Sequence, residues 1–199
     1  MKIFKYIISK IIIIYLKIIG INISFKANIT KVPYLKINGK AKNIKIGKAN
    51  ILGKIDLRNR ENGKITIEDN CKIEADCRIV SAREGTVIIG KNSVLTMGAI
   101  INGGGNVIIG QNCILGPRII INANEHVFKK DKPINEQGFI HKDVIIEDDC
   151  WFGAYVVINK GSFIKKGSVV GALSLITKST DEYSINVGIP TKKIGERKS

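Results

Sequence analysis

The sequence predicts an all-β protein, a parallel β-helix of about six coils. The main observation is a period of six residues: in the C-terminal half, large apolar side chains recur at every sixth position without a slip. An α-helix repeats every 3.6 residues and a simple strand every two, so neither explains this period by itself. The run comprises Ile146, Phe152, Ile158, Ile164, Val170 and Ile176.

Two further observations support the same register. Three consecutive positions of the period describe a coil of eighteen residues with three short sides, and upstream residues continue the series. Four residues after each apolar position, a second inward position holds small side chains, because little room remains inside a narrow coil. The upstream apolar positions are Ile67, Ile73 and Ile79, then Ile89, Leu95 and Ile101, then Ile109, Leu115 and Ile121, with Ile46 and Leu52 opening the series. The small position is filled by Cys71, Cys77, Ser93, Cys113, Cys150, Ser162, Ser168 and Ser174.

Residues 1–24 are predicted to form an amphipathic N-terminal segment. The longest uncharged run is too short to span a bilayer, and no small-residue cleavage site follows it, so neither a transmembrane helix nor a signal peptide is predicted. Its lysines and Ser9 share one side of a helical projection, opposite a broad isoleucine surface. Two interpretations remain open: residues 1–20 lie in a membrane interface, or the helix packs across the base of the prism or against another subunit. The predicted location is cytoplasmic, either free or peripheral on the inner face of the cytoplasmic membrane.

The β-helix domain is predicted to span residues 25–178. Glycine or a carboxylate often follows the apolar residue at once, as at Gly90, Glu147 and Gly153. These positions are predicted to be corners, where glycine tolerates unusual dihedral angles. The four cysteines all occupy the small inward position, so they are interpreted as buried apolar residues rather than as nucleophiles or disulfide partners.

A large insertion interrupts the repeat at about residues 123–143. His126 begins this insertion, and a neutral imidazole at the edge of a groove can accept a proton near neutral pH. We therefore predict that His126 is catalytic, while Glu125, Glu136 and a backbone carbonyl remain open as groups that orient it. The only other histidine, His141, lies near the end of the insertion and is interpreted as a structural loop residue.

Trp151 and the C-terminal tail supply further candidates. Trp151 is the only tryptophan and follows the inward Cys150, so its indole should point outward, where it can cover a ligand or a partner chain. The predicted tail, residues 179–199, follows the last coil. Lys178, Lys192 and Lys193 could contact phosphates as point charges.

Composition narrows the functional classes. The net charge of +15 comes mostly from lysines at outward positions, without a nucleic-acid-binding motif or interleaved aromatic residues, so no nucleic-acid partner is predicted. Such a surface would still favour polyanionic ligands such as coenzyme A. No Cys-x-x-Cys pattern occurs, and two histidines are too few for a three-histidine metal site, so no metal is predicted.

Together these motifs make the chain similar to the hexapeptide-repeat acyltransferases, over roughly residues 44–195. It resembles the galactoside and maltose acetyltransferases and especially the O-acetyltransferases of bacterial surface polysaccharides. The most specific stretches are residues 144–154, 170–178 and 187–192, together with the loop from His126 to Gly138.

The resemblance implies a left-handed β-helix and a homotrimer with active sites in grooves between subunits. It implies that His126 is the catalytic base and that acetyl-CoA, the donor substrate, binds beside Trp151. It places further acetyl-CoA contacts at Ala154, Ala172, Thr177, Lys178 and Lys192. The family usually has a second basic residue where this chain has Gly195, and Lys193 or Arg197 is the expected replacement.

The expected function is acetyl-CoA-dependent O-acetylation of a sugar hydroxyl on a bacterial surface glycan, either a capsule or a lipopolysaccharide or lipooligosaccharide. Two alternatives remain open. One is N-acetylation of a nucleotide amino sugar, and the other is a non-catalytic β-helix that serves as an assembly scaffold.

Overall fold

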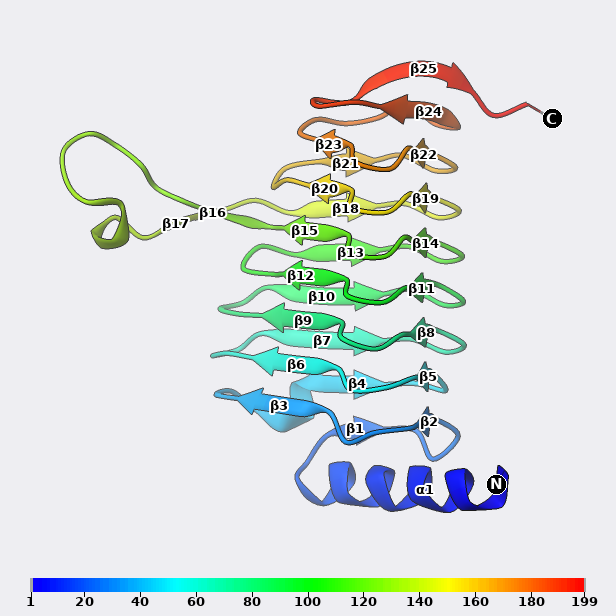
Figure 1. Ribbon diagram of the computed structural model, residues 1–199. Coiled ribbons are helices and arrows are strands. Elements are labelled where there is room, and N and C mark those ends of the chain that lie inside the picture. The colour runs from blue at the N-terminus through cyan, green and yellow to red at the C-terminus, as the bar shows by residue number, and fades with distance from the viewer. Residues whose placement is uncertain (1, 199) are drawn as a thin grey trace.

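The computed structural model describes residues 2–198, which form a three-sided prism of stacked coils (Figure 1). Each coil contributes one short strand to each of three sheets, and all pairings between neighbouring coils are parallel. Helix α1 (Lys2–Ile18) lies across one end of the stack, and the antiparallel pair β24 and β25 lies at the other. The predicted all-β solenoid is confirmed, with about seven coils rather than six.

The three sheets run along the length of the prism. Sheet 1 contains β1 (Asn22–Ile23), β4 (Ile44–Ile46), β7 (Lys64–Ile67), β10 (Thr86–Ile89), β13 (Val107–Ile109), β18 (Val144–Ile146) and β21 (Phe163–Ile164). Sheet 2 contains β2 (Asn28–Ile29), β5 (Asn50–Ile51), β8 (Lys72–Ile73), β11 (Val94–Leu95), β14 (Ile114–Leu115), β19 (Trp151–Phe152), β22 (Val169–Val170), β24 (Ser184–Val187) and β25 (Lys192–Glu196). Sheet 3 contains β3 (Tyr34–Ile37), β6 (Asp56–Asn59), β9 (Arg78–Ser81), β12 (Ile100–Asn102), β15 (Ile120–Asn122), β20 (Val157–Ile158) and β23 (Leu175–Ile176).

The additional coil lies at the N-terminal end. It starts at Asn22, and a short 3₁₀ helix, η1 (Ala41–Asn43), leads from it into the second coil. The spacing hid this coil because its positions Ile23 and Leu35 are out of phase with Ile46. In the second coil, the corner between Ile46 and Ile51 is one residue short, so Ile51 rather than Leu52 points inward and pairs with Ile73. The expected position of Leu52 in the core is therefore wrong.

Asparagine and aspartate supply the left-handed backbone at five of the corners before the small inward position, and Gly98, Gly161 and Gly167 supply it at three others. Asn70, Asn92 and Asn112 all have positive φ angles, and their side-chain amides form a ladder in which Asn70 donates to Asn92 and Asn92 donates to Asn112. Gly90 has ordinary dihedrals, but a Cβ there would lie 2.5 Å from the carbonyl oxygen of Gly110. Close stacking of the coils, rather than an unusual dihedral angle, therefore requires glycine at that corner.

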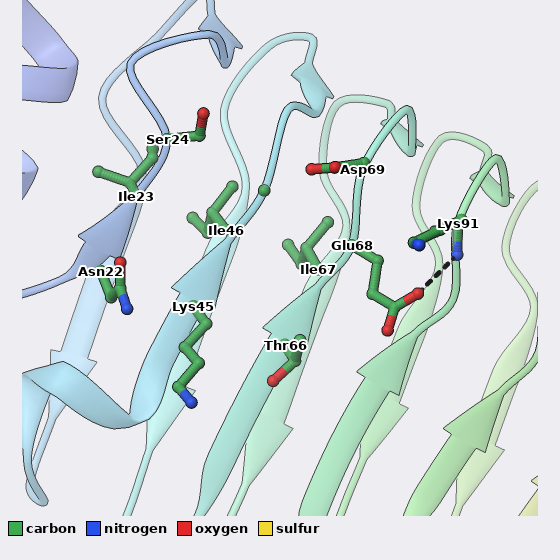
Figure 2. A pocket seen from close by; sticks show the side chains of 11 residues that line it. Asn22, Ile23, Ser24, Lys45, Ile46, Thr66, Ile67, Glu68, Asp69 and Lys91 are labelled. Carbon is green, nitrogen blue, oxygen red and sulfur yellow. Dashed lines mark hydrogen bonds between the residues drawn. The ribbon is translucent and has the colours of Figure 1, made fainter.

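Carboxylates at the corners tie neighbouring coils together (Figure 2). The backbone N–H of Lys91 donates to Glu68 from the following coil, and that of Lys48 donates to Asp69 from the preceding one. Glu68, Asp69 and Lys91 line a hollow of about 400 Å³ on the outside of sheet 1. Because backbone donors already engage both carboxylates, we interpret this hollow as a structural corner.

Helix α1 closes the base of the prism. Ile12, Ile13 and Leu16 are buried against the first coil, and the Ser9 hydroxyl accepts a hydrogen bond from the backbone N–H of Ile29 at 2.9 Å. Packing across the base, one of the two interpretations of this segment, is thus present in the structure. Within residues 2–198 no helix has the length and apolarity needed to cross a bilayer.

Candidate functional site

The insertion forms a two-stranded hairpin that projects from the prism between sheets 3 and 1 (Figure 1). Strand β16 (Asn124–His126) pairs antiparallel with β17 (Phe139–His141), and a 3₁₀ turn, η2 (Ile134–Glu136), lies near the tip. The side chain of Gln137 holds the tip closed: its amide oxygen accepts from the Lys129 N–H at 2.7 Å, and its amide nitrogen donates to the Lys129 carbonyl at 2.9 Å. The Gln137 side chain thus fixes the shape of the loop tip.

His126 lies at the outer end of β16 with an exposed side chain. Its imidazole packs against the ring of Phe139, with ring centroids 4.1 Å apart, and within residues 2–198 it makes no side-chain hydrogen bond. Glu125, one of the candidates for orienting His126, instead forms an ion pair with Lys160 at 2.5 Å. Adjacent residues of a strand face opposite sides, so Glu125 fixes the base of the hairpin to the next coil.

His141, which the sequence analysis interpreted as a structural loop residue, has a specific packing position in the structure. It faces the same side of the hairpin as Phe139, and its imidazole lies against the backbone of Gly104. Both ring nitrogens are buried without a hydrogen-bond partner in the described part of the chain. Burial lowers the pKa of His141 below its ordinary value, and the nearby cation Arg83 acts in the same direction. The lowered pKa favours the neutral form of the His141 imidazole. The ring of Phe139 lies beside both histidine rings.

A shallow hollow of about 340 Å³ lies at the corner where the hairpin leaves the prism. Three glycines leave backbone exposed there, and Arg83, Glu84 and Asp143 supply charged groups at its edge. Asp143 is already engaged by Asn106, which donates from its backbone at 2.7 Å and from its amide at 3.0 Å. Glu84 in turn accepts a hydrogen bond from the side-chain amide of Asn62 at 2.6 Å, so among the charged groups of this hollow only Arg83 makes no side-chain hydrogen bond within residues 2–198.

Three of the predicted acetyl-CoA positions lie on or beside sheet 2. Trp151 is exposed in β19, as predicted, and Ala154 and Ala172 follow β19 and β22 at the corner between sheets 2 and 3. The pairing of Trp151 with Val169 places Ala172 directly over the Ala154 corner, where the Leu173 N–H donates to the Ala154 carbonyl at 2.9 Å. Small side chains thus lie in register on adjacent coils at this corner.

The structure brings Thr177, Lys178 and Lys192 together. They line one hollow of about 280 Å³ at the C-terminal end of the prism. Neither Lys178 nor Lys192 forms an ion pair within residues 2–198. Lys193 is bound to Glu196 at 2.6 Å and to Asp181 at 3.3 Å, and Arg197 to Asp149 at 2.8 Å. The two expected replacements for the missing basic residue are thus already paired within the chain.

His126 lies on a different edge of the prism from the predicted acetyl-CoA positions Ala154 and Ala172, whereas Thr177 and Lys178 follow β23 at the edge that the hairpin leaves. The His126 hairpin leaves the corner between sheets 3 and 1, whereas Ala154 and Ala172 line the corner between sheets 2 and 3. Figure 1 shows the hairpin extending to one side while β19 and β22 lie on the other.

The cysteines behave as predicted. Cys71, Cys77, Cys113 and Cys150 are free and buried, and Cys113 lies beneath Cys150 on the next coil. Burial raises the pKa of the Cys71 and Cys77 thiols to about 11, so neither is a ready nucleophile. Within residues 2–198, no three His, Cys, Asp or Glu side chains gather as they would around a metal ion.

Comparison with known proteins agrees with this geometry. A family model described as "Hexapeptide repeat of succinyl-transferase" matches residues 64–102 and 143–178. Two stretches of this chain are thus similar to hexapeptide repeats. This confirms the expected resemblance to the hexapeptide-repeat acyltransferases and the expected left-handed β-helix.

Curated relatives match over about a third of the chain. One is a "probable acetyltransferase" of Mycobacterium tuberculosis, 37% identical over 65 residues, which are 33% of this chain and 22% of that protein. Another is a chloramphenicol acetyltransferase of Klebsiella aerogenes, 38% identical over 55 residues, which are 28% of this chain and 26% of that protein. The chain thus spans about a quarter of the length of these relatives.

Solved structures match over a larger part of the chain. The polySia-specific acetyltransferase NeuO is 26% identical with a TM-score of 0.61, and the match covers 82% of each chain. A hexapeptide-repeat-containing acetyltransferase of Vibrio cholerae, complexed with acetyl-CoA, is 28% identical with a TM-score of 0.53, covering 57% of this chain and 61% of the other. The N-acyltransferase AntD of Bacillus cereus covers 93% of this chain and 89% of its own at 24% identity and a TM-score of 0.62, and that likeness concerns the fold alone.

Proposed function

We propose that this protein is an acetyl-CoA-dependent O-acetyltransferase that modifies a sugar hydroxyl of a bacterial surface glycan. One observation carries the proposal: the hairpin that interrupts the repeat presents His126 with an exposed imidazole that makes no hydrogen bond within residues 2–198. Similar solved structures support this class of reaction, since they include acetyltransferases and a complex with acetyl-CoA.

The donor substrate lies along the corner formed by Ala154 and Ala172. The small side chains leave room for the narrow pantetheine arm, and the indole of Trp151 flanks it on sheet 2. The hollow at the C-terminal end then receives the phosphates. Lys178 and Lys192 have their ammonium groups free for this purpose, and Thr177 adds a hydroxyl donor.

Transfer is direct. His126 takes the proton of the acceptor hydroxyl as the oxygen attacks the thioester carbonyl carbon, and backbone N–H groups stabilise the resulting oxyanion. The C–S bond then breaks, the acetyl group stays on the sugar oxygen, and the departing thiolate recovers the proton from His126. No covalent enzyme intermediate is needed, in keeping with the four buried thiols.

The active form in this proposal is a homotrimer. His126 and the Ala154–Ala172 corner lie on different edges of one prism, so a second subunit completes each site. The hairpin also carries exposed apolar side chains at Phe128, Ile134 and Ile140, which a neighbouring prism would cover. Light scattering of the purified protein should give three times the mass of the 21.9 kDa chain, and a monomer with full activity would contradict this part of the proposal.

The deciding experiment measures free-thiol release from acetyl-CoA with a panel of sugar, amino-sugar and glycan acceptors. Replacing His126 by Ala should reduce acceptor-dependent release by a factor of roughly 10²–10⁴ while leaving the fold intact. His141→Gln serves as the second histidine variant, because it separates a chemical role of His126 from a general disturbance of the hairpin. Near-normal activity of His126→Ala, or release with amine acceptors alone, would refute the proposed O-acetylation.

A further inference from the structure

Helix α1 is apolar on two opposite faces. One face carries Ile12, Ile13 and Leu16, which are buried against the first coil. The opposite face is exposed, with its isoleucines spaced three or four residues apart so that they form one stripe along the helix. The stripe consists of Ile3, Ile7, Ile11, Ile14 and Ile18, flanked by Phe4 and Tyr15. A helix that only closed the prism would need the first face and not the second.

The stripe is the end surface of the molecule. Figure 1 shows α1 lying flat across the base, at right angles to the direction in which the coils stack. None of the later coils approaches its outer side, which faces away from the whole stack (Figure 1). An exposed contiguous apolar surface of this kind marks an interaction site.

The surroundings of the stripe carry one sign of charge. Residues 1–55 contain twelve lysines and no acidic residue; the first carboxylate in the sequence is that of Asp56. These residues form α1, the first coil and part of the second, so most of the net charge of +15 gathers at the base. The base of the prism therefore presents the isoleucine stripe with lysine ammonium groups around it.

A hollow of about 480 Å³ lies at the rim of the base, beside α1. Its lining consists of three lysines and two aromatic residues, without a carboxylate: Tyr6, Lys10, Phe25, Lys26 and Lys48. Lys10 is held over the Tyr6 ring at 4.8 Å, and Lys17 lies over the Phe25 ring at 4.5 Å. Lysines next to amphipathic aromatic rings are the chemistry that a phosphate headgroup meets at a bilayer surface.

From these observations we infer that the base of the prism is a docking surface for an anionic lipid bilayer, with α1 in the interface and the coils standing away from it. The isoleucine stripe enters the headgroup boundary, and the basal lysines contact lipid phosphates. A second copy of the chain is disfavoured as occupant, because two such bases would bring like charges face to face. Within a trimer whose prisms run side by side, three helices would meet one membrane plane and bind together.

Co-sedimentation of the full chain with lipid vesicles tests the inference. The protein should bind vesicles of phosphatidylcholine that contain phosphatidylglycerol, and raising the salt concentration should release it. Vesicles of phosphatidylcholine alone should bind it far less. Equal binding to both compositions, or no binding to either, would overturn the inference whatever the protein's enzymatic activity proves to be.

Point substitutions identify the surface. Ile11→Glu should weaken vesicle binding by about tenfold or more, because it places a charge in the exposed isoleucine stripe that enters the bilayer. It does not touch the face of α1 that packs on the prism. Ile194→Glu is the matched control: Ile194 is 65% exposed against 61% for Ile11, but lies in β25 at the opposite end of the stack. Circular dichroism should show both variants folded. If the two variants bind equally well, α1 is not the docking surface.

Tryptophan fluorescence then tests the orientation. The native Trp151 lies in the sixth coil, so brominated lipids should leave its emission unchanged when the protein binds vesicles. An added tryptophan in Ile11→Trp should be quenched by the same lipids. Quenching of Trp151 in the unmodified protein, or release of a larger oligomer into smaller ones by Ile11→Glu without any effect on vesicle binding, would contradict the inference.

Discussion

The imidazole of His141 lies directly against Gly104: a Cβ on this glycine would be 2.5 Å from Nδ1 of the histidine. The contact joins the base of the hairpin to the preceding coil, while Glu125 and Lys160 join it to the following one. The hairpin that carries His126 is therefore held from below and from above. Its position depends on residues that the chemistry itself does not use.

Gly104→Ala should displace His141 and loosen the hairpin. The clash involves an aromatic ring held between the hairpin and the prism, so we expect a loss of about 1–3 kcal/mol in stability and a faster cleavage of residues 127–138 by proteases. Gly195→Ala is the matched control, since nothing lies within 4 Å of its Cβ position. Urea unfolding and limited proteolysis measure both effects, and identical behaviour of the two variants would contradict the proposed support.

Acid should destabilise the folded protein through His141. Burial lowers the pKa of His141 below its ordinary value of 6.5, so the unfolded chain binds a proton that the folded chain resists. Stability should therefore fall as the pH drops below 6.5 and recover as it rises above that value. His141→Gln should flatten this part of the dependence in urea unfolding between about pH 5.5 and about pH 7.5. An unchanged slope in the variant would show that His141 is not the group responsible.

Lys178 and Lys192 should matter for donor binding more than Lys193. Each of the first two has a free ammonium group, whereas Lys193 is bound to Glu196 and Asp181. Lys178→Ala and Lys192→Ala should each raise the KM for acetyl-CoA by about tenfold with little change in kcat, as expected for one lost charge-assisted contact. Lys193→Ala should leave KM nearly unchanged. A larger effect at Lys193 than at Lys178 would place the phosphates elsewhere.

The thiols should resist alkylation while the protein is folded. Burial raises the pKa of Cys71 and Cys77 to about 11, and all four cysteines are buried. Iodoacetamide should therefore label none of them in the native protein at neutral pH and all of them in denaturant, as mass spectrometry would show. Labelling of folded protein that abolishes activity would implicate a thiol in the reaction and contradict direct transfer.

The period of six predicts the core because inward positions have no alternative in such a narrow coil. Residues such as Ile109 and Phe152 are buried as the spacing requires. The first coil escaped because its apolar positions, which end at Leu35, are out of phase with the series that starts at Ile46. In the second coil the corner before Ile51 is one residue short, and a period detects only corners of equal length. The role of Gly90 was misjudged because contacts between coils, unlike dihedral preferences, cannot be counted along the chain.

The break in the repeat indicates where the candidate site lies, and His126 stands at its edge. Its neighbours could not be predicted in the same way. The partner of His126, Phe139, is set by how the hairpin pairs, and the burial of His141 depends on the absence of a side chain at Gly104. Pairings across a loop are determined in three dimensions and leave no fixed spacing in the sequence.

The regular stacking of coils gives the molecule a built-in length scale. The hairpin leaves the fifth coil, about 20 Å above the first at a rise of about 4.8 Å per step. Duplicating one whole coil below β15 would lift His126 by one such step and change no residue of the hairpin. The separation between the basal helix and the hairpin is thus adjustable by repeat number alone, independently of the chemistry that the hairpin carries.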